Sequence, residues 1–104
     1  MKGKEYNKLV RDNIPGFLDS KGILYEKRIA TDLEYREELI KKLLEEAREF
    51  SEVGSLSELA DVVEVLESLK KLPEYKDLEN VRLNKLKERG AFENRYIVKG
   101  IDDR

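Results

Sequence analysis

The stretch EEAREFSEVGSLSELAD, residues 45–61, contains two acidic pairs on either side of a glycine. In each pair the residues are three apart: Glu46 with Glu49, and Glu58 with Asp61. Residues at i and i+3 share one face of a helix, so two helices joined by a tight turn at Gly54 would place the pairs opposite each other. Four converging carboxylates repel one another unless a cation binds between them. Hard oxygen ligands of this kind suit Mg²⁺ or Mn²⁺.

The composition is that of one small, highly charged domain covering residues 1–104. Charged residues make up 42% of the chain and hydrophobic residues 39%, with a net charge of -2. This balance argues against a protein that binds a nucleic-acid polymer through bulk positive charge. The apolar residues recur periodically, which indicates a folded chain rather than a disordered one.

Several classes of site are excluded because the chain has neither cysteine nor histidine. It can form no disulfide, no thiolate nucleophile and no imidazole metal site. The first residues lack the apolar run of a signal peptide, and no segment approaches membrane-spanning length. We therefore expect a cytoplasmic protein without a membrane partner.

Two long helices are predicted around the glycine turn. Thr31 and Glu34 match a capping box, and a helix follows to about Val53. Gly54 is the predicted C-cap of this helix. Its apolar stripe consists of Leu39, Ile40, Leu43, Leu44, Ala47 and Phe50.

The second helix is predicted to start at a serine cap, Ser55 or Ser57, and to run to about Leu72. At about 100° per residue its apolar positions cover more than half of the circumference, whereas one core face needs a stripe of only about 100°. The excess indicates burial from two sides, which favours an oligomer. The apolar positions are Leu56, Leu59, Val62, Val63, Val65, Leu66 and Leu69.

The remaining segments are shorter, and the fold class we expect is an all-α helical bundle. A short helix should begin near Asp12 or Asn13, with Pro15 in its first turn, and end at Gly22. A third long helix, about 75–89, should follow Pro73 and stop at Gly90. Two short extended segments are expected near 23–29 and 96–98, and they could pair with each other.

The acidic pairs have to be weighed against chance, because 23 acidic residues make such spacings common. The simpler interpretation is exposed helix charge, with Glu58 as part of a cap. Position favours a site, since Glu46 and Glu58 fall within the apolar stripes of their helices. Carboxylates are almost never buried unpaired, and a cation would supply the partner. For Glu49 and Asp61, nearer the stripe edges, the pattern is weaker.

Carboxylates without histidine or cysteine indicate metal-assisted chemistry on phosphates. Such a site also needs cations for the charge of substrate and product. The candidates near the two ends of the chain are Lys8, Arg11, Lys87 and Arg89. For any single one of the 21 basic residues, solvated surface is the simpler interpretation.

EEAREF followed by ELAD resembles the EExxE…ExxD motif of the all-α nucleoside triphosphate pyrophosphohydrolases, the superfamily of the MazG-like proteins, dimeric dUTPases and phosphoribosyl-ATP pyrophosphohydrolases. Further blocks resemble a MazG-like subgroup and extend the likeness over nearly the whole chain. These blocks are YNKLVRDNIP at 6–15, KLLEEAREF and SELADVVEVLESL in the centre, and KERGAFENRY at 87–96.

The resemblance implies a Mg²⁺-dependent reaction, in which an NTP and water give NMP and pyrophosphate. By motif position, Glu46, Glu49, Glu58 and Asp61 would be metal ligands and catalytic residues, and Glu45 would assist or be exposed. Lys8, Arg11, Lys87 and Arg89 match basic positions that would contact phosphates or a neighbouring subunit. The implied architecture is a four-helix arrangement assembled as a homodimer or homotetramer.

Two departures from the family pattern affect the site. Only eight residues, 50–57, separate Glu49 from Glu58, which leaves little chain to shape a base pocket. Ala91 stands where a glycine is expected, which matters only if that position needs a positive φ. The sequence therefore does not identify the nucleobase of the substrate. Two alternative functions also stay open: a phosphoribosyl-ATP pyrophosphohydrolase, and a non-catalytic helical interaction module.

Overall fold

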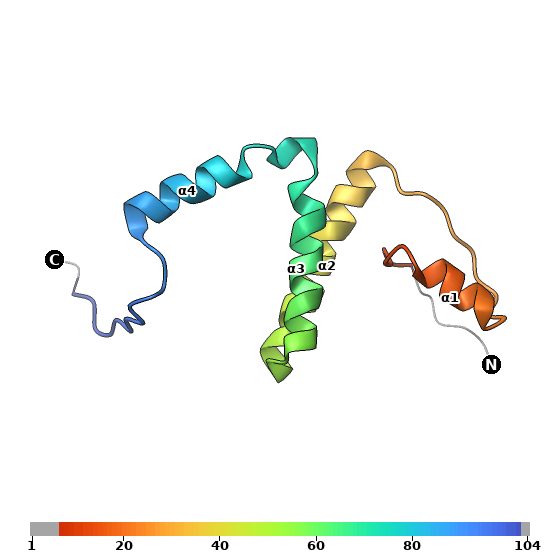
Figure 1. Ribbon diagram of the computed structural model, residues 1–104, viewed down its shortest axis with the longest axis horizontal. Helices are drawn as coiled ribbons and strands as arrows, with labels where there is room; N and C mark the ends of the chain where they lie inside the picture. The colour runs from red at the N-terminus through yellow and green to blue at the C-terminus, as the bar shows by residue number, and fades with distance from the viewer. Residues whose placement is uncertain (1–6, 103–104) are drawn as a thin grey trace.

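The structure, a computed structural model, describes residues 7–102 of the chain. Its elements are all helical, which confirms the all-α prediction, and Figure 1 shows their arrangement. In chain order they are α1 (Ile14–Ser20), α2 (Asp32–Val53), α3 (Leu56–Lys70), the 3₁₀ helix η1 (Pro73–Tyr75) and α4 (Leu78–Arg89).

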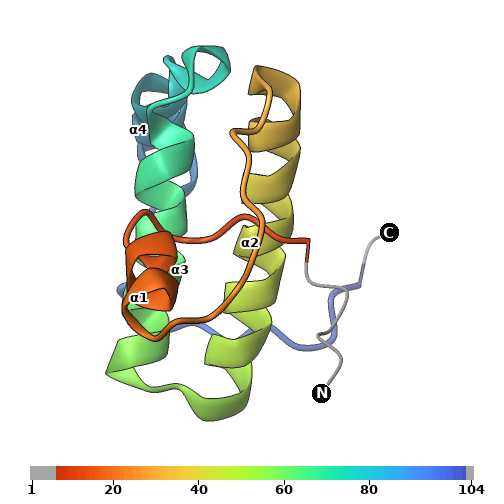
Figure 2. The same ribbon diagram turned by 90° about the vertical axis from the view of Figure 1, so that its right-hand side faces the viewer.

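The centre of the molecule is the antiparallel hairpin of α2 and α3, which Figure 2 shows side by side. The predicted caps form on both helices. Thr31 Oγ1 accepts a hydrogen bond from the Glu34 amide, and Ser55 Oγ accepts one from the Glu58 amide, each over 3.2 Å. Gly54 ends α2 with a φ of 69°, a left-handed conformation that glycine adopts without steric cost. The turn therefore brings Glu46 of α2 opposite Glu58 and Asp61 of α3.

The core of the hairpin is small. Among the described residues, the buried hydrophobic side chains are Leu39, Val65 and Leu69. Partly buried side chains pack against them from the hairpin, from the N-terminal segment and from the segment after α3: Leu9, Tyr35, Leu43, Leu72 and Tyr75. Arg36 Nε also donates a hydrogen bond to Tyr75 Oη over 3.1 Å, which ties the end of the hairpin to η1.

The N-terminal segment and α1 lie on one side of the hairpin (Figure 2). Pro15 occupies the first turn of α1, where its missing N–H costs no hydrogen bond. Tyr25 Oη lies 2.9 Å from Asp19 Oδ1, so the segment after α1 is fastened back onto it. No side-chain cap forms at Asn13.

Helix α4 and the tail run away from the hairpin on the other side (Figure 1). The molecule measures 62 × 32 × 26 Å, and its radius of gyration is 18.9 Å. A compact chain of this length has a radius of gyration of about 13 Å. A single chain therefore does not fold into a compact domain that packs around α4.

Two parts of the predicted secondary structure are wrong. No β-strand forms among residues 7–102. Segments 23–29 and 96–98 do not pair, because α4 carries the tail to the opposite end of the molecule (Figure 1). The third helix begins at Leu78 rather than near 75, since Pro73 starts a 3₁₀ turn first. No helix in the described part of the chain is long and apolar enough to span a bilayer.

Candidate functional site

Three of the four predicted ligands converge between the helices of the hairpin. Glu46 comes from α2, and Glu58 and Asp61 come from the first two turns of α3. One carboxylate oxygen of each residue lies within 4.8 Å of the others, and all three residues are half-buried. The juxtaposition expected from the i, i+3 spacing and the Gly54 turn is thus present for these three residues.

Glu46 has an environment that is unfavourable for a carboxylate. Its Oε2 atom is buried and has no hydrogen-bond partner. Burial raises the pKa of Glu46, and a hydrogen bond with Glu49 and repulsion from Glu49 and Asp61 raise this pKa further. The Lys42 ammonium opposes the shift only in part. Glu49, although exposed, therefore adjoins the cluster as its fourth carboxylate.

The donor set fits a divalent cation. All candidate atoms are carboxylate oxygens, the ligands that Mg²⁺ prefers. Oxygens on opposite sides of Mg²⁺ lie about 4.2 Å apart, because each is about 2.1 Å from the ion. A cluster spanning 4.8 Å therefore needs only small side-chain adjustments to hold one ion. A cation would also give the orphaned Glu46 oxygen a partner.

Two of the predicted basic residues reach the same region from the N-terminal segment. Arg11 Nη1 donates to Asp61 Oδ1 over 3.0 Å, and Lys8 Nζ donates to Glu45 Oε2 over 2.9 Å. The structure thus places Lys8 and Arg11 beside carboxylates of the hairpin. Tyr6, the first residue of the block 6–15, lies outside the described residues.

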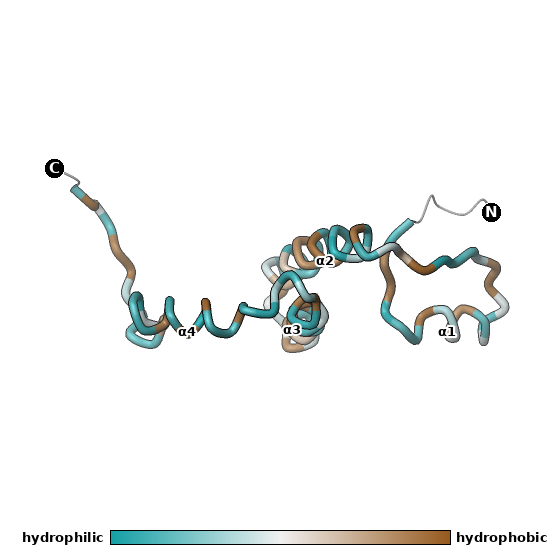
Figure 3. The backbone as a smooth tube through the Cα atoms, turned by 90° about the horizontal axis from the view of Figure 1, so that it is seen from above, coloured by the Kyte–Doolittle hydropathy of each residue, from teal (hydrophilic) through white to brown (hydrophobic). Residues whose placement is uncertain are grey.

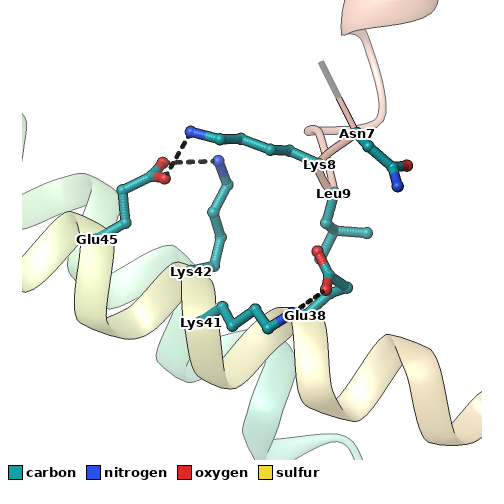
Figure 4. A pocket seen from close by; sticks show the side chains of 7 residues that line it. All are labelled: Asn7, Lys8, Leu9, Glu38, Lys41, Lys42 and Glu45. Atoms are coloured by element: carbon teal, nitrogen blue, oxygen red, sulfur yellow. Dashed lines mark hydrogen bonds and ion pairs between the residues drawn. The ribbon is translucent and has the colours of Figure 1, made fainter. Parts of the chain in front are cut away.

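Lys42 is a further basic residue at the site, and it is not among the residues predicted from the sequence. Its half-buried side chain donates to Glu45 Oε1 over 3.0 Å, beside the contact that Lys8 makes with Oε2 of the same carboxylate (Figure 4). The hydrogen bonds from Lys8 and Lys42 lower the pKa of Glu45. Glu45 is therefore a paired anion rather than bare surface charge. The signal available in the sequence was the i, i+3 spacing from Lys42 to Glu45.

An open pocket of about 270 Å³ lies beside these lysines (Figure 4). Lys41 is held at its rim by Glu38, over 3.1 Å. The pocket therefore presents ammonium groups next to the acidic cluster. Its lining residues are Asn7, Lys8, Leu9, Glu38, Lys41, Lys42 and Glu45.

Lys87 and Arg89, the other two predicted basic residues, are not brought to the cluster within one chain. Both lie in the last turn of α4, which runs away from the hairpin (Figure 1). Ala91 does not have a positive φ; among the described residues other than glycine, only Arg95 does, with a φ of 60°. The alanine therefore introduces no backbone strain at that position.

No family model, no curated protein and no solved structure matches the chain. The family resemblance therefore remains a prediction carried by the motif residues.

Proposed function

We propose that this protein is a metal-dependent nucleoside triphosphate pyrophosphohydrolase that releases NMP and pyrophosphate. The observation that carries the proposal is the buried, unpartnered Oε2 of Glu46 among converging carboxylates. An isolated chain gains nothing from such an arrangement, because repulsion and desolvation both oppose it. A bound divalent cation removes both costs.

The roles of the residues follow from their positions. Glu46, Glu58 and Asp61 would hold Mg²⁺ or Mn²⁺, with Glu49 beside them as a fourth ligand. When bound, the ion would screen the charge of the phosphates and orient a water molecule. The products require that water supplies an oxygen to phosphorus while the anhydride bond between the α- and β-phosphates breaks.

Cationic side chains would bind the phosphates from the N-terminal side. In the structure Arg11 and Lys8 form ion pairs with Asp61 and Glu45, and both basic side chains are partly exposed. A polyphosphate entering beside the cluster would compete with Asp61 and Glu45 for these donors. Arg11 can meet a phosphate with two parallel hydrogen bonds, which gives orientation as well as charge.

The test is a product assay on a panel of standard, deoxy and modified NTPs and phosphoribosyl-ATP, with Mg²⁺, Mn²⁺ or EDTA. We expect metal-dependent NMP and pyrophosphate. Glu46→Gln and Asp61→Asn should reduce turnover to background while helix content by circular dichroism stays nearly unchanged. Glu52→Gln, an exposed acid on the same helix, is the matched control and should keep full activity. Full activity in Glu46→Gln or Asp61→Asn would refute the proposal.

A second candidate is a non-catalytic helical interaction module. The observation that favours it is the apolar surface that the hairpin and α4 leave exposed. A ligand that binds only the folded state must raise its stability. A module that binds no metal should therefore show no thermal stabilisation by Mg²⁺ or Mn²⁺. Stabilisation that disappears in Asp61→Asn would instead favour the enzyme.

A further inference from the structure

The pocket beside the hairpin has a lining that suits a small anion. It lies between the N-terminal segment and residues 38, 41, 42 and 45 of α2, whose spacing of three and four places them on one helix face. Figure 4 shows Lys8 reaching from the N-terminal segment, and Lys42 from α2, to the carboxylate of Glu45. Three ammonium groups and two carboxylates line the pocket, so its net charge is +1, although the whole chain has a net charge of -2.

The ammonium groups on α2 can bind an anion without giving up their present partners. Each lysine ammonium has three N–H donors. Lys41 donates one hydrogen bond to Glu38 over 3.1 Å, and Lys42 donates one to Glu45 over 3.0 Å. Their other donors can turn to an anion in the pocket. Hydrogen bonds from an ammonium group to phosphate oxygens are charge-assisted, so they are stronger than neutral ones.

Size and lining indicate a phosphate group rather than a whole nucleotide. Pockets that enclose drug-sized ligands measure about 300–1,000 Å³, whereas this pocket measures about 270 Å³. Among the described residues that line it, Leu9 is the one apolar side chain, and none is an aromatic ring on which a base could stack. The base of a nucleotide would therefore lie outside the pocket.

A shallow hollow connects the pocket with the acidic cluster. This hollow, of about 390 Å³, shares Lys41 and Glu45 with the pocket and continues along α2 to Glu49. Lys42 also precedes Glu46 by about one helical turn, which is about 6 Å along the axis. Helix α4 leaves the hairpin on the side opposite the N-terminal segment (Figure 3), so it does not cover this path. One ligand can therefore extend from the lysines to the carboxylates.

We propose that this pocket binds the terminal diphosphate group of a nucleoside triphosphate, the part that leaves as pyrophosphate. The name of the ligand rests on the proposed function, whereas the choice of a small anion rests on the lining. Lys8, Lys41 and Lys42 contact the β- and γ-phosphates, while the α-phosphate lies at the carboxylate cluster beside Arg11. The nucleoside then extends away from the pocket. A monophosphate leaves the pocket empty, so the arrangement selects triphosphates.

Calorimetric titration of the full-length protein with pyrophosphate, inorganic phosphate and an intact NTP, all in EDTA, tests the assignment. We expect saturable binding of pyrophosphate and of the NTP at one site per chain. Inorganic phosphate should bind about tenfold more weakly, because it engages fewer of the ammonium groups. Equal affinities for phosphate and pyrophosphate would overturn the assignment to a diphosphate. Binding of pyrophosphate without binding of the NTP would overturn the position given to the substrate.

Substitutions with opposite effects locate the binding site. Lys42→Gln should weaken pyrophosphate binding about tenfold through the loss of a charge-assisted hydrogen bond. Glu38→Gln should strengthen binding, because it removes a carboxylate that repels the anion, and a merely structural role would give no such gain. Lys70→Gln is the matched control, since Lys70 forms a similar i, i+3 pair with Glu67 on α3. An unchanged affinity in Lys42→Gln, or an equal loss in Lys70→Gln, would overturn the proposal.

These titrations contain no metal and involve no turnover, so their outcome is separate from that of the hydrolysis assay. If no NTP is hydrolysed but pyrophosphate binding still depends on Lys42, the proposed reaction is wrong and the anion site stands. If NTPs are hydrolysed but pyrophosphate binding does not depend on Lys42, only the assignment of the pocket is wrong.

Discussion

The two sides of the α2–α3 hairpin differ in how far the chain covers them. On one side charged groups form ion pairs within the chain, whereas on the other side apolar side chains remain partly exposed. Lys8, Lys42 and Arg11 pair with carboxylates and cover that side with charge. The other side carries large apolar side chains that are 41–54% exposed, and we call this set the outer apolar face: Ile40, Leu44, Leu59, Val63 and Leu66. Surface ion pairs contribute little energy, whereas apolar burial is the main favourable term in folding. Covering the apolar side would therefore stabilise the protein more than the ion pairs on the polar side do.

The largest effect is expected from a charge on the outer apolar face. Leu66→Glu should destabilise the fold by about 3 kcal/mol, because it places a carboxylate without a partner among half-buried apolar side chains. Urea denaturation at fixed protein concentration, followed by circular dichroism, measures the loss. Leu24→Glu, at a position 97% exposed, should change stability by less than about 0.5 kcal/mol. Equal effects of the two substitutions would mean that this face is ordinary surface.

A smaller effect is expected from metal binding on the other side. Mg²⁺ at 100 times its dissociation constant should stabilise the fold by about 2.7 kcal/mol relative to EDTA. Thermal denaturation with and without the ion measures this difference. Asp61→Asn should remove most of the stabilisation, and Glu52→Gln should retain it. An identical shift in all three proteins would place the ion elsewhere.

Two neighbouring carboxylates should respond to pH in opposite directions in metal-free protein. The pKa of Glu46 is raised in the folded state, so its ionisation lowers stability as pH rises through that pKa. Glu46→Gln should therefore stabilise the protein at pH 7–8, with no gain in acid. The pKa of Glu45 is lowered, so its contribution is present at neutral pH and is lost as pH falls through the folded pKa.

Glu45→Gln should accordingly be destabilising at pH 7–8 and neutral in acid. Denaturation curves of both variants and the unsubstituted protein, measured from pH 3 to 8 in EDTA, give the sign of each change in the free energy of unfolding. The same sign for both substitutions at pH 8 would contradict the contrast between a paired and an unpaired carboxylate.

The smallest effect is expected from the ion pair between Arg11 and Asp61. The two side chains are 63% and 38% exposed, so Arg11→Gln should cost less than about 1 kcal/mol. The loss should shrink further at high salt, because exposed charges are screened. Urea denaturation at low and high ionic strength measures both values. A loss of several kcal/mol would show that the N-terminal segment is needed for folding.

Local signals in the sequence were sufficient to predict the hairpin and the convergence of Glu46, Glu58 and Asp61. Thr31, Gly54 and Ser55 act through backbone groups a few residues away, so their roles could be read from spacing. The i, i+3 spacing allows the pairing of Lys42 with Glu45, but the contact of the same carboxylate with Lys8 joins residues 37 apart in the chain, which spacing cannot predict. Helix α4 is placed by the 3₁₀ turn that begins at Pro73, whose direction spacing does not specify, and this turn also delays the start of the helix.

Among residues 7–102 the buried core consists of three side chains, Leu39, Val65 and Leu69. If most of the apolar surface is covered only when two chains meet, unfolding is also dissociation, and its midpoint must depend on how much protein is present. Each tenfold dilution then costs about 1.4 kcal/mol of dimer stability. A chain of this kind would be folded where it is abundant and open to proteolysis where it is scarce, so its own abundance would set its lifetime.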